Sequence, residues 1–493
     1  MKVVRGSCVV VVEYTEHEKH EIADLFSVLN KEYAIVAKKM RRFSNIPKYF
    51  RYFYMGNGKI FLPSGALHVL QEKFRNIEVL DATTFQKIDL KLVEKIIPRE
   101  WQKPAANASA KNPNGIFLVP TAGGKTFFGM ILTASYSSRT LILCDTGDIY
   151  DQWVDSVEKL FGIECGQIRA KKFDVRDITV ATVQTLIKRK HLCKEIKNFF
   201  SLMLVDECQM IGPTKKEDKF GDGTAVYNSM GSVVQWFSCR RKYGLTDAAA
   251  RSDSQDRSIN FALGPVIYQV PFTALEEEGS VIRPKLIVIP TQFTLSPGLS
   301  DPKDQKEKYN KCLQELLNSQ YRNRLILEVM CRFKGQKNLI LANNKEFILL
   351  LHKMLIERMP EVADRSVVVT ADTKITKKAE RVDAIERARR GEIEYFFATS
   401  LGDKGLDVPP MENLLNVFPS KFKGKQRQRV GRVVRSCEGK EHSFVVDFAD
   451  ILVPMFRTQF TGRVNQVYRD RCEINYDNPT IRGLKIFRKV EKL

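Results

Sequence analysis

The sequence has no uninterrupted apolar run near the ~18 residues that a membrane-spanning helix requires, which excludes such a helix. Its ten cysteines are scattered, without a C-x-x-C pair or a neighbouring histidine cluster, so neither a disulfide framework nor a zinc site is indicated. The early apolar run Cys8–Val12 is interrupted by Glu13 and no small-residue cleavage site follows, so a buried strand is predicted rather than a signal peptide. These absences favour a reducing compartment, the cytoplasm.

Acidic residues are the second deficit. The chain of 493 residues carries 58 Asp and Glu against 79 Lys and Arg, a net charge of +21. Such an excess indicates a polyanionic partner, with nucleic acid first and an anionic membrane surface second. Because apolar residues still make up 43% of the chain, most of it can bury a core, and the length alone favours about three domains.

The chain from Glu100 onward has the pattern of a parallel α/β protein. Short runs of Val, Ile and Leu alternate with longer stretches of helical period, and the runs are too continuous for a sheet with one wet face. Prolines and the acidic run Glu276–Glu278 interrupt the series between Gln269 and Pro302, so we expect a linker between two lobes. The predicted strands are Ile116–Val119, Thr140–Cys144, Ile178–Ala181, Leu202–Val205, Asn338–Ala342, Ser366–Thr370, Tyr395–Thr399 and Ser443–Val446.

The first 95 residues lack this alternation, which predicts a separate small α+β domain. Between Tyr33 and Gln71 there is no acidic residue, and eight aromatics are interleaved with basic residues. Cations bind phosphates, whereas aromatic rings either stack on bases or fill the core of the domain, and both interpretations of the aromatics stay open. The basic residues predicted to contact nucleic acid here are Lys38, Lys39, Arg41, Arg42, Lys48 and Arg51.

A short glycine-rich segment follows the first predicted strand and precedes a stretch of helical period. Phosphates need unhindered backbone N–H groups at a helix N-terminus, which small residues allow. Lys125 can then reach the β and γ phosphates, and the Thr126 hydroxyl can ligate Mg²⁺, although Val119 replaces the first glycine of the strict pattern. The residues predicted to bind ATP are Thr121, Ala122, Gly123, Gly124, Lys125 and Thr126.

Two carboxylates, Asp206 and Glu207, directly follow the apolar run Leu202–Val205. At the carboxyl end of a parallel strand, on the sheet edge where a phosphate loop lies, one carboxylate can hold Mg²⁺ through water while the other orients the attacking water. We expect Asp206 to be the metal partner and Glu207 the base. Such a pair alone is usually a solvated turn, and it is the upstream phosphate loop that favours this role.

With these motifs in this order, the chain resembles a superfamily 2 helicase over residues 98–450. Residues 99–102 resemble its glutamine motif, 141–153 and 180–185 its motifs Ia and Ib, 244–248 its motif III, and 398–409 its motif V. Gln209 departs from the family pattern, which usually has His or Asp there. The resemblance implies nucleotide contacts by Arg99, Gln102, Gly405, Asp407 and Gln428, and nucleic-acid contacts by Gln152, Thr182, Gln184 and Thr399.

Residues 428–435 match the family's motif VI and also have a physical interpretation. Arginine is always charged and presents a planar fork of donors, so Arg432 and Arg435, three apart on one predicted helix face, can stabilise charge developing on the γ-phosphate. They lie in the second lobe and Lys125 in the first, so hydrolysis would require the lobes to close on ATP. The preceding lysines are predicted to contact nucleic acid: Lys421, Lys423 and Lys425.

Within the superfamily, the chain looks like the phage-encoded UvsW group and the wider XPB-like DNA helicases. The shared features are the spelling of the phosphate loop, the Gln152-Trp153 pair and the basic, aromatic N-terminal domain. This resemblance implies ATP-driven remodelling of branched DNA in replication, recombination and repair, including branch migration, with 3′ to 5′ movement.

The sequence therefore predicts two RecA-like α/β lobes behind a small α+β DNA-recognition domain. The expected boundaries are 1–95 for the N-terminal domain, 96–280 and 285–455 for the lobes, and 456–493 for a basic C-terminal tail. DNA is the expected partner of a monomer, with no membrane partner. Two alternatives stay open: an RNA helicase or transcript-release ATPase on the same engine, and a nucleic-acid-binding scaffold without catalysis.

Overall fold

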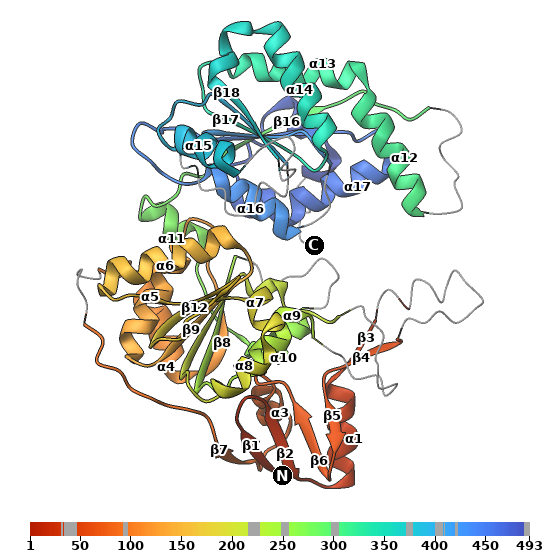
Figure 1. Ribbon diagram of the computed structural model, residues 1–493. Coiled ribbons are helices and arrows are strands. Elements are labelled where there is room, and N and C mark those ends of the chain that lie inside the picture. Colours follow the sequence, from red (N-terminus) through yellow and green to blue (C-terminus); the bar gives the residue numbers. More distant parts are fainter. Residues whose placement is uncertain are drawn as a thin grey trace. The chain divides into compact units, whose positions relative to one another are not determined.

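The fold was analysed in a computed structural model of the chain. The structure describes residues 1–30, 33, 47–91, 97–214, 227–247, 256–296, 305–370, 378–399, 408, 410–419 and 423–487, with the backbone alone at 305, 306, 378, 423–425 and 485. The chain forms two compact units, one made of residues 1–120 and 124–271 and the other of residues 121–123 and 272–493 (Figure 1). Among the described residues, no helix is long and apolar enough to cross a membrane.

The N-terminal part of the first unit is a small mixed sheet with strand order β5-β6-β2-β1-β7. All pairs in it are antiparallel except β1 with β7. Thr15 and Glu18 form a capping box that starts α1, and β3 pairs separately with β4. The elements are β1 Lys2–Arg5, β2 Val9–Glu13, α1 Glu16–Leu25, β3 Ser27–Leu29, β4 Tyr49–Arg51, β5 Tyr54–Gly56, β6 Lys59–Leu62, α3 Leu67–Lys73 and β7 Glu78–Asp81.

The rest of the first unit is built on an eight-stranded sheet of order β11-β10-β12-β9-β13-β14-β8-β15. Every pair is parallel except β10 with the edge strand β11. Strands β9, β12 and β13 are buried at every residue, as expected for a sheet covered on both faces. The strands are β8 Asn114–Leu118, β9 Thr140–Cys144, β10 Gly166–Arg169, β11 Lys172–Phe173, β12 Ile178–Thr182, β13 Leu202–Asp206, β14 Arg241–Thr246 and β15 Val266–Gln269.

Helices cover both faces of this sheet (Figure 1). Helices α4, α5 and α6 lie along one face, and α7, α9 and α10 along the other. This arrangement leaves the carboxyl ends of the strands free to carry loops. The helices of the first unit after residue 97 are α4 Gln102–Lys111, α5 Lys125–Tyr136, α6 Gly147–Phe161, α7 Val183–Lys188, α8 Lys190–Glu195, η1 Cys208–Met210, α9 Ser229–Val234 and α10 Arg257–Leu263.

The small sheet and the large sheet share one apolar core. The Phe261 ring of α10 lies 4.8 Å from the ring of Phe26 and 5.2 Å from that of Tyr52, measured between centroids. Polar contacts join the same surfaces, since Lys242 Nζ donates to the carbonyl oxygens of Ser7 at 2.9 Å and Val234 at 2.8 Å. Burial lowers the pKa of Lys242 to about 8. The N-terminal sheet is thus packed into the first unit.

The second unit contains a six-stranded, fully parallel sheet of order β16-β21-β20-β17-β19-β18. Helices α13 and α14 lie on one face, and α16 and α17 on the other (Figure 1). The elements are α11 Phe272–Glu277, β16 Lys285–Pro290, α12 Gln305–Asn318, α13 Gln320–Arg332, β17 Asn338–Ala342, α14 Lys345–Arg358, η2 Pro360–Arg365, β18 Ser366–Val369, α15 Lys378–Arg389, β19 Tyr395–Thr399, β20 Asn413–Asn416, α16 Lys423–Val433 and β21 Phe444–Ala449.

Most of the described C-terminal residues after β21 are helical. They form α17 Pro454–Arg463, a π-helical turn η3 Val464–Tyr468, α18 Arg469–Arg471, α19 Pro479–Gly483 and η4 Lys485–Phe487. Phe456, Phe460 and Tyr468 are at most 1% exposed. This part of the chain therefore packs as part of the second unit, where the sequence suggested a basic tail.

The predicted fold class is confirmed: two parallel α/β sheets follow a small α+β portion. Two local predictions differ from the structure. The proline-containing stretch expected to be a linker contributes β16, an edge strand whose last residue is Pro290, a position where proline disrupts no inner hydrogen bonds. Arg435 does not lie on a helix face with Arg432, because α16 ends at Val433 and Arg435 pairs in an isolated bridge with Val281.

Candidate active site

The predicted phosphate loop connects β8 to α5. Lys125 is the first residue of α5, and Gly124 precedes it with a φ of 85°. Ala122 also adopts a positive φ, 70°, in the left-handed region that non-glycine residues rarely occupy. Backbone strain of this kind concentrates at ligand-binding sites. The loop thus presents backbone N–H groups and the Lys125 side chain at a helix N-terminus, as a phosphate group requires.

Sheet order brings the predicted catalytic motifs together. Strands β13, β14 and β8 are successive neighbours, and all three run parallel. Their carboxyl ends carry Asp206, Thr246 and the phosphate loop, respectively. Residues more than 80 positions apart in sequence therefore lie at one edge of the sheet. Glu207, directly after β13, has a φ of 50° and is a second strained residue at this edge.

A chain of polar contacts runs through this edge. Lys125 Nζ donates to Glu207 Oε1 at 3.0 Å, and Gln209 Nε2 donates to Glu207 Oε2. The Thr246 hydroxyl in turn donates to Gln209 Oε1 at 2.5 Å. Gln209 thus joins the acidic motif to motif III with its two-ended amide, although it departs from the usual residue of the family. The sequence named Gln209 as a departure but did not predict this link.

Burial and charge act against each other on the three ionisable groups. Burial lowers the pKa of Lys125, but the carboxylates of Glu207, Asp206 and Asp247 raise it by more, so the net shift of this pKa is upward. Burial raises the pKa of Glu207, but Lys125 and Gln209 bring it below its ordinary value. The pKa of Asp206 is raised, chiefly by burial. Lys125 and Glu207 consequently form an ion pair.

Trp153 is a site residue that sequence reasoning did not assign. It lies in α6 and is fully buried, and its indole Nε1 donates to Asp206 Oδ2 at 2.9 Å. A Cβ atom at Gly129 of α5 would lie 2.4 Å from the Trp153 ring, so only glycine allows α5 to approach this close. The sequence cannot show which residue of α6 reaches β13. The Gln152-Trp153 pair was the only sequence feature that pointed to this helix.

The predicted glutamine motif lies beside the phosphate loop. Gln102 Oε1 accepts a hydrogen bond from the Arg99 backbone N–H at 2.9 Å. The Gln102 side chain is fully buried, and among the described residues its Nε2 has no hydrogen-bond partner. This Nε2 lies 3.7 Å from where a Cβ atom on Gly124 would be. A buried, unused donor next to a phosphate loop fits the acceptor edge of a nucleotide base.

The predicted nucleic-acid contacts of the first unit lie in different environments. Gln152 is half-buried on α6, whereas the Thr182 side chain at the end of β12 is buried and bonded to Thr185 Oγ1 at 2.8 Å. Gln184 is exposed, and its Nε2 donates to the Asp145 carbonyl at 2.7 Å. The loop after β9 is thereby tied to the first turn of α7. Gln152 and Gln184 can reach a ligand, whereas Thr182 mainly positions its loop.

In the second unit, the described motif VI residues lie on and just after α16. Gln428, Arg432 and Arg435 are half-buried. The pKa of Arg435 is lowered, mainly by burial and also by the positive charge of the nearby Arg389. Thr399 ends β19 with a buried side chain. The predicted residues that lie outside the described residues, or whose side chains do, are Lys38, Lys39, Arg41, Arg42, Gly405, Asp407, Lys421, Lys423 and Lys425.

The aromatic run of the N-terminal portion divides between core and surface. Tyr52 is 2% exposed and belongs to the core, while Tyr49 is 40% and Tyr54 52% exposed. Lys48 and Arg51 are exposed, and Lys48 Nζ lies 5.3 Å from the centre of the Tyr49 ring. The core interpretation therefore holds for Tyr52, and base stacking stays a prediction for the exposed Tyr49 and Tyr54. Exposed rings beside cations form a surface suited to single-stranded nucleic acid.

The site defines a class of protein. A phosphate loop with a lysine and two carboxylates at the carboxyl edge of a parallel sheet are parts that P-loop nucleotide hydrolases have in common. Two family models match in succession: "Type III restriction enzyme, res subunit" over residues 89–246 and "Helicase conserved C-terminal domain" over residues 320–437. The chain is an ATP-dependent superfamily 2 helicase, and its predicted resemblance to the XPB proteins is confirmed.

Individual relatives are distant. The "DNA 3'-5' translocase XPB2" of Sulfurisphaera tokodaii is 23% identical over 386 residues, which cover 72% of this chain and 82% of that protein. For seven further relatives the match covers 42% to 64% of their length. Among solved structures, the type ISP restriction-modification enzyme LlaBIII bound to DNA has a TM-score of 0.52 at 13% identity, covering 85% of this chain and 34% of that one. T4 UvsW covers 96% and 98% of the two chains at 16% identity, with a TM-score of 0.40.

Proposed function

We propose that this chain hydrolyses ATP at the edge formed by β8, β13 and β14. Lys125 would release Glu207 and hold the β and γ phosphates, and Thr126 and Asp206 would hold Mg²⁺, which neutralises phosphate charge when bound. Glu207 would then be free to orient the attacking water. The single observation that carries this proposal is the Lys125–Glu207 pair, since the triphosphate can displace it and so free both catalytic groups at once.

Coupling to nucleic acid would use the polar chain beyond Glu207. Gln209 touches both Glu207 and the Thr246 hydroxyl, so a change in the position of Glu207 is transmitted to the end of β14. We propose that Arg432 and Arg435 approach the γ-phosphate when the two units close on ATP. One cycle of closing and reopening would advance the protein along a strand.

The proposed substrate is DNA, in particular forked or junction DNA that the protein unwinds and branch-migrates during replication, recombination and repair. The name of the archaeal relative supports a DNA substrate and 3′ to 5′ movement. The exposed Lys48, Tyr49, Arg51 and Tyr54 support single-stranded DNA contact, because each stacked base contributes ~1–3 kcal/mol. We also propose that the protein acts in the cytoplasm as a monomer.

Nucleic-acid-stimulated ATPase and strand displacement test this function. The substrates are single-stranded DNA, single-stranded RNA, a fork and a four-way junction, with Lys125→Ala as the inactive reference. We expect the fork and the junction to stimulate turnover most and to be unwound. Greater stimulation by RNA would favour an RNA helicase, as the mimivirus relative named "RNA helicase L396" would suggest. Binding without any stimulated turnover would favour a scaffold.

A further inference from the structure

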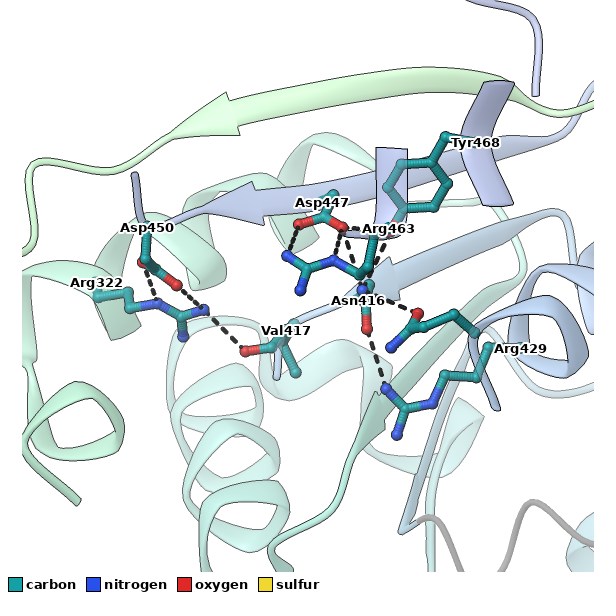
Figure 2. A network of polar contacts seen from close by, with 9 residues as sticks. Arg322, Asn416, Val417, Arg429, Asp447, Asp450, Arg463 and Tyr468 are labelled. Carbon is teal, nitrogen blue, oxygen red and sulfur yellow. Dashed lines mark hydrogen bonds and ion pairs between the residues drawn. The ribbon is translucent and has the colours of Figure 1, made fainter. Parts of the chain in front are cut away.

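The second unit contains a buried polar network beneath α16 (Figure 2). Asn416, the last residue of β20, lies at its centre and is 2% exposed. Its Oδ1 accepts a hydrogen bond from Arg429 Nη1 at 3.1 Å. Its Nδ2 lies 3.2 Å from Asp447 Oδ2 and 3.3 Å from Tyr468 Oη. The amide is therefore oriented by an arginine on one side and a carboxylate on the other.

The carboxylate side of the network is rigid. Asp447 of β21 is fully buried and receives two hydrogen bonds from Arg463 of α17, Nε at 2.6 Å and Nη2 at 2.7 Å. The Tyr468 hydroxyl donates to the same carboxylate. Burial and the neighbouring Asp447 raise the pKa of Tyr468 well above its ordinary value, so the hydroxyl keeps its proton. A bidentate pair with a third donor leaves Asp447 little freedom to move.

Arg429 connects this anchor to α16. Its side chain is 1% exposed, and its second terminal nitrogen, Nη2, donates to Asn343 Oδ1 at 2.7 Å. Asn343 follows β17 and Asn416 ends β20, and these strands are neighbours in the sheet. One guanidinium thus spans the ends of two adjacent strands. Gln426, one turn earlier, adds a contact to Asn416 Nδ2 at 3.3 Å.

The C-terminal end of the same helix is held separately. Lys440 Nζ donates to the carbonyl oxygens of Val433 at 2.6 Å, Arg435 at 2.9 Å and Met411 at 2.7 Å. Val433 is the last residue of α16, so the ammonium satisfies a carbonyl that the helix leaves open. Arg432 lies in the sequence between Arg429 and the residues that Lys440 binds. Arg435 is one of those residues, bound through its carbonyl oxygen.

We propose that Arg429 is a positioning residue for Arg432 and Arg435, and that it fixes the rotation of α16 on the sheet through Asn416 and Asn343. This inference rests on the proposed function, in which those two arginines contact the γ-phosphate in the transition state. A displacement of ~1 Å at a catalytic group can cost ~10²-fold in rate. The network would therefore act on turnover and leave ground-state ATP binding unchanged.

Arg429→Lys is the direct test, because lysine keeps the charge but cannot span two acceptors. Arg322→Lys is the matched control. Arg322 is equally buried and bonds Asp450 at 2.9 and 3.1 Å and the Val417 carbonyl at 3.0 Å, so its contacts include no residue of α16 (Figure 2). We expect both variants to melt at a lower temperature. Only Arg429→Lys should lower kcat, by ~10- to 100-fold.

Two binding measurements separate positioning from loss of structure. Arg429→Lys should weaken binding of ADP with aluminium fluoride, a transition-state mimic, ~10- to 100-fold, and leave a non-hydrolysable ATP analogue within ~2-fold. If Arg429→Lys does not fold, Asn343→Ala serves instead, because Asn343 is exposed, and a ~3- to 10-fold loss of kcat is expected.

The inference is overturned if Arg429→Lys and Arg322→Lys lower kcat alike, or if neither Arg429→Lys nor Asn343→Ala changes it. The proposed function fails on a different result, namely normal turnover in Arg435→Ala. With Arg435→Ala inactive and Arg429→Lys fully active, the function would stand and the positioning role would fall.

Discussion

Each of the two units contains a cluster of charged groups, half-buried in the first unit and buried in the second, and the clusters are built in opposite ways. In the first unit, Lys125 and Glu207 share a single contact, the backbone at Glu207 is strained, and the Gln102 Nε2 donor is unused among the described residues. In the second unit, Asp447 and Arg463 form a bidentate pair that Tyr468 completes. In the first cluster, polar groups such as Gln102 Nε2 and Lys125 Nζ can still bind a ligand. In the second cluster, the polar groups already bind one another.

This difference teaches what each cluster does. Lys125, which is proposed to change partners during a cycle, makes one side-chain hydrogen bond among the described residues, to Glu207, and a ligand can replace it. A group that must stay in place is held by several contacts from different elements, as Asp447 of β21 is by Arg463 of α17, Tyr468 of η3 and Asn416 of β20. Substitutions in the first cluster should therefore alter activity more than stability, and those in the second should do the reverse. Four substitutions test this contrast.

Lys125→Ala should have the largest effect on activity. We expect ATP hydrolysis to fall ~10³-fold or more, because the phosphates lose their charged donor. The melting temperature should change little, since the pair it removes can be replaced by solvent at a ligand site. Stimulated ATPase and thermal unfolding measure both, with Lys103→Ala, an exposed lysine paired to Glu100, as the control. Near-normal hydrolysis would contradict the site.

Asp447→Asn should have the largest effect on stability. It leaves the Arg463 guanidinium buried at 3% exposure without its carboxylate, and breaking such a pair costs ~3–5 kcal/mol. Urea unfolding gives the free energy, and Asp470→Asn, which breaks the partly exposed pair with Arg427, should cost at most ~1 kcal/mol. Equal losses from the two substitutions would show that the buried pair is not a special anchor.

Trp153→Phe should have an intermediate effect confined to the metal. The ring volume is largely kept but Asp206 loses the indole N–H donor. Removing such a contact to a metal-binding residue typically lowers metal affinity ~10-fold or more. The Mg²⁺ concentration for half-maximal ATPase should rise accordingly, whereas the half-buried Trp236, changed to Phe, should leave it unchanged. An unaltered Mg²⁺ curve for Trp153→Phe would remove Trp153 from the site.

Lys440→Met should have the smallest effect, visible as a dependence on pH. Burial lowers the pKa of Lys440 from 10.5 to about 8, while Cys437 and Glu412 raise it and Arg435 lowers it further. The unfolded chain then binds this proton more tightly than the folded one, so the free energy of unfolding gains with rising pH between these values. The wild type should gain up to ~1.4 kcal/mol per pH unit over Lys440→Met. A flat or falling difference in urea unfolding between pH 8 and 10 would contradict this.

Sequence reasoning worked best where chemistry and chain position coincide. The runs Thr140–Cys144, Asn338–Ala342 and Tyr395–Thr399 are strands with the predicted bounds, because short apolar runs that alternate with helical stretches are typical of a sheet covered on both faces. Strand β14 was not predicted, since it begins Arg241-Lys242 and reads as polar. Its Lys242 is buried nonetheless because Nζ reaches two carbonyl oxygens.

The sequence predicted that the phosphate loop and the carboxylates share one sheet edge, but not which further side chains of distant segments touch. The order β13-β14-β8 decides that Gln209 meets Thr246, and the packing of α6 on α5 decides that Trp153 meets Asp206. No local pattern encodes either choice. The end of α16 is a similar case, because Lys440 bonds the carbonyl oxygens of Val433 and Arg435 where the helix ends, whereas the local spacing alone favoured continuing it. The roles assigned to these side chains stay predictions until the variants are measured.

The core shared by the small and the large sheet has a practical consequence for anyone trimming this protein. Phe261 rests against Phe26 and Tyr52, and Tyr227 lies 5.2 Å from Tyr52. A shortened chain starting at residue 97 would lose Phe26 and Tyr52. The rings of Phe261 and Tyr227 would then be exposed to water, which favours aggregation. A shortened version of the protein should therefore keep all residues that precede β8.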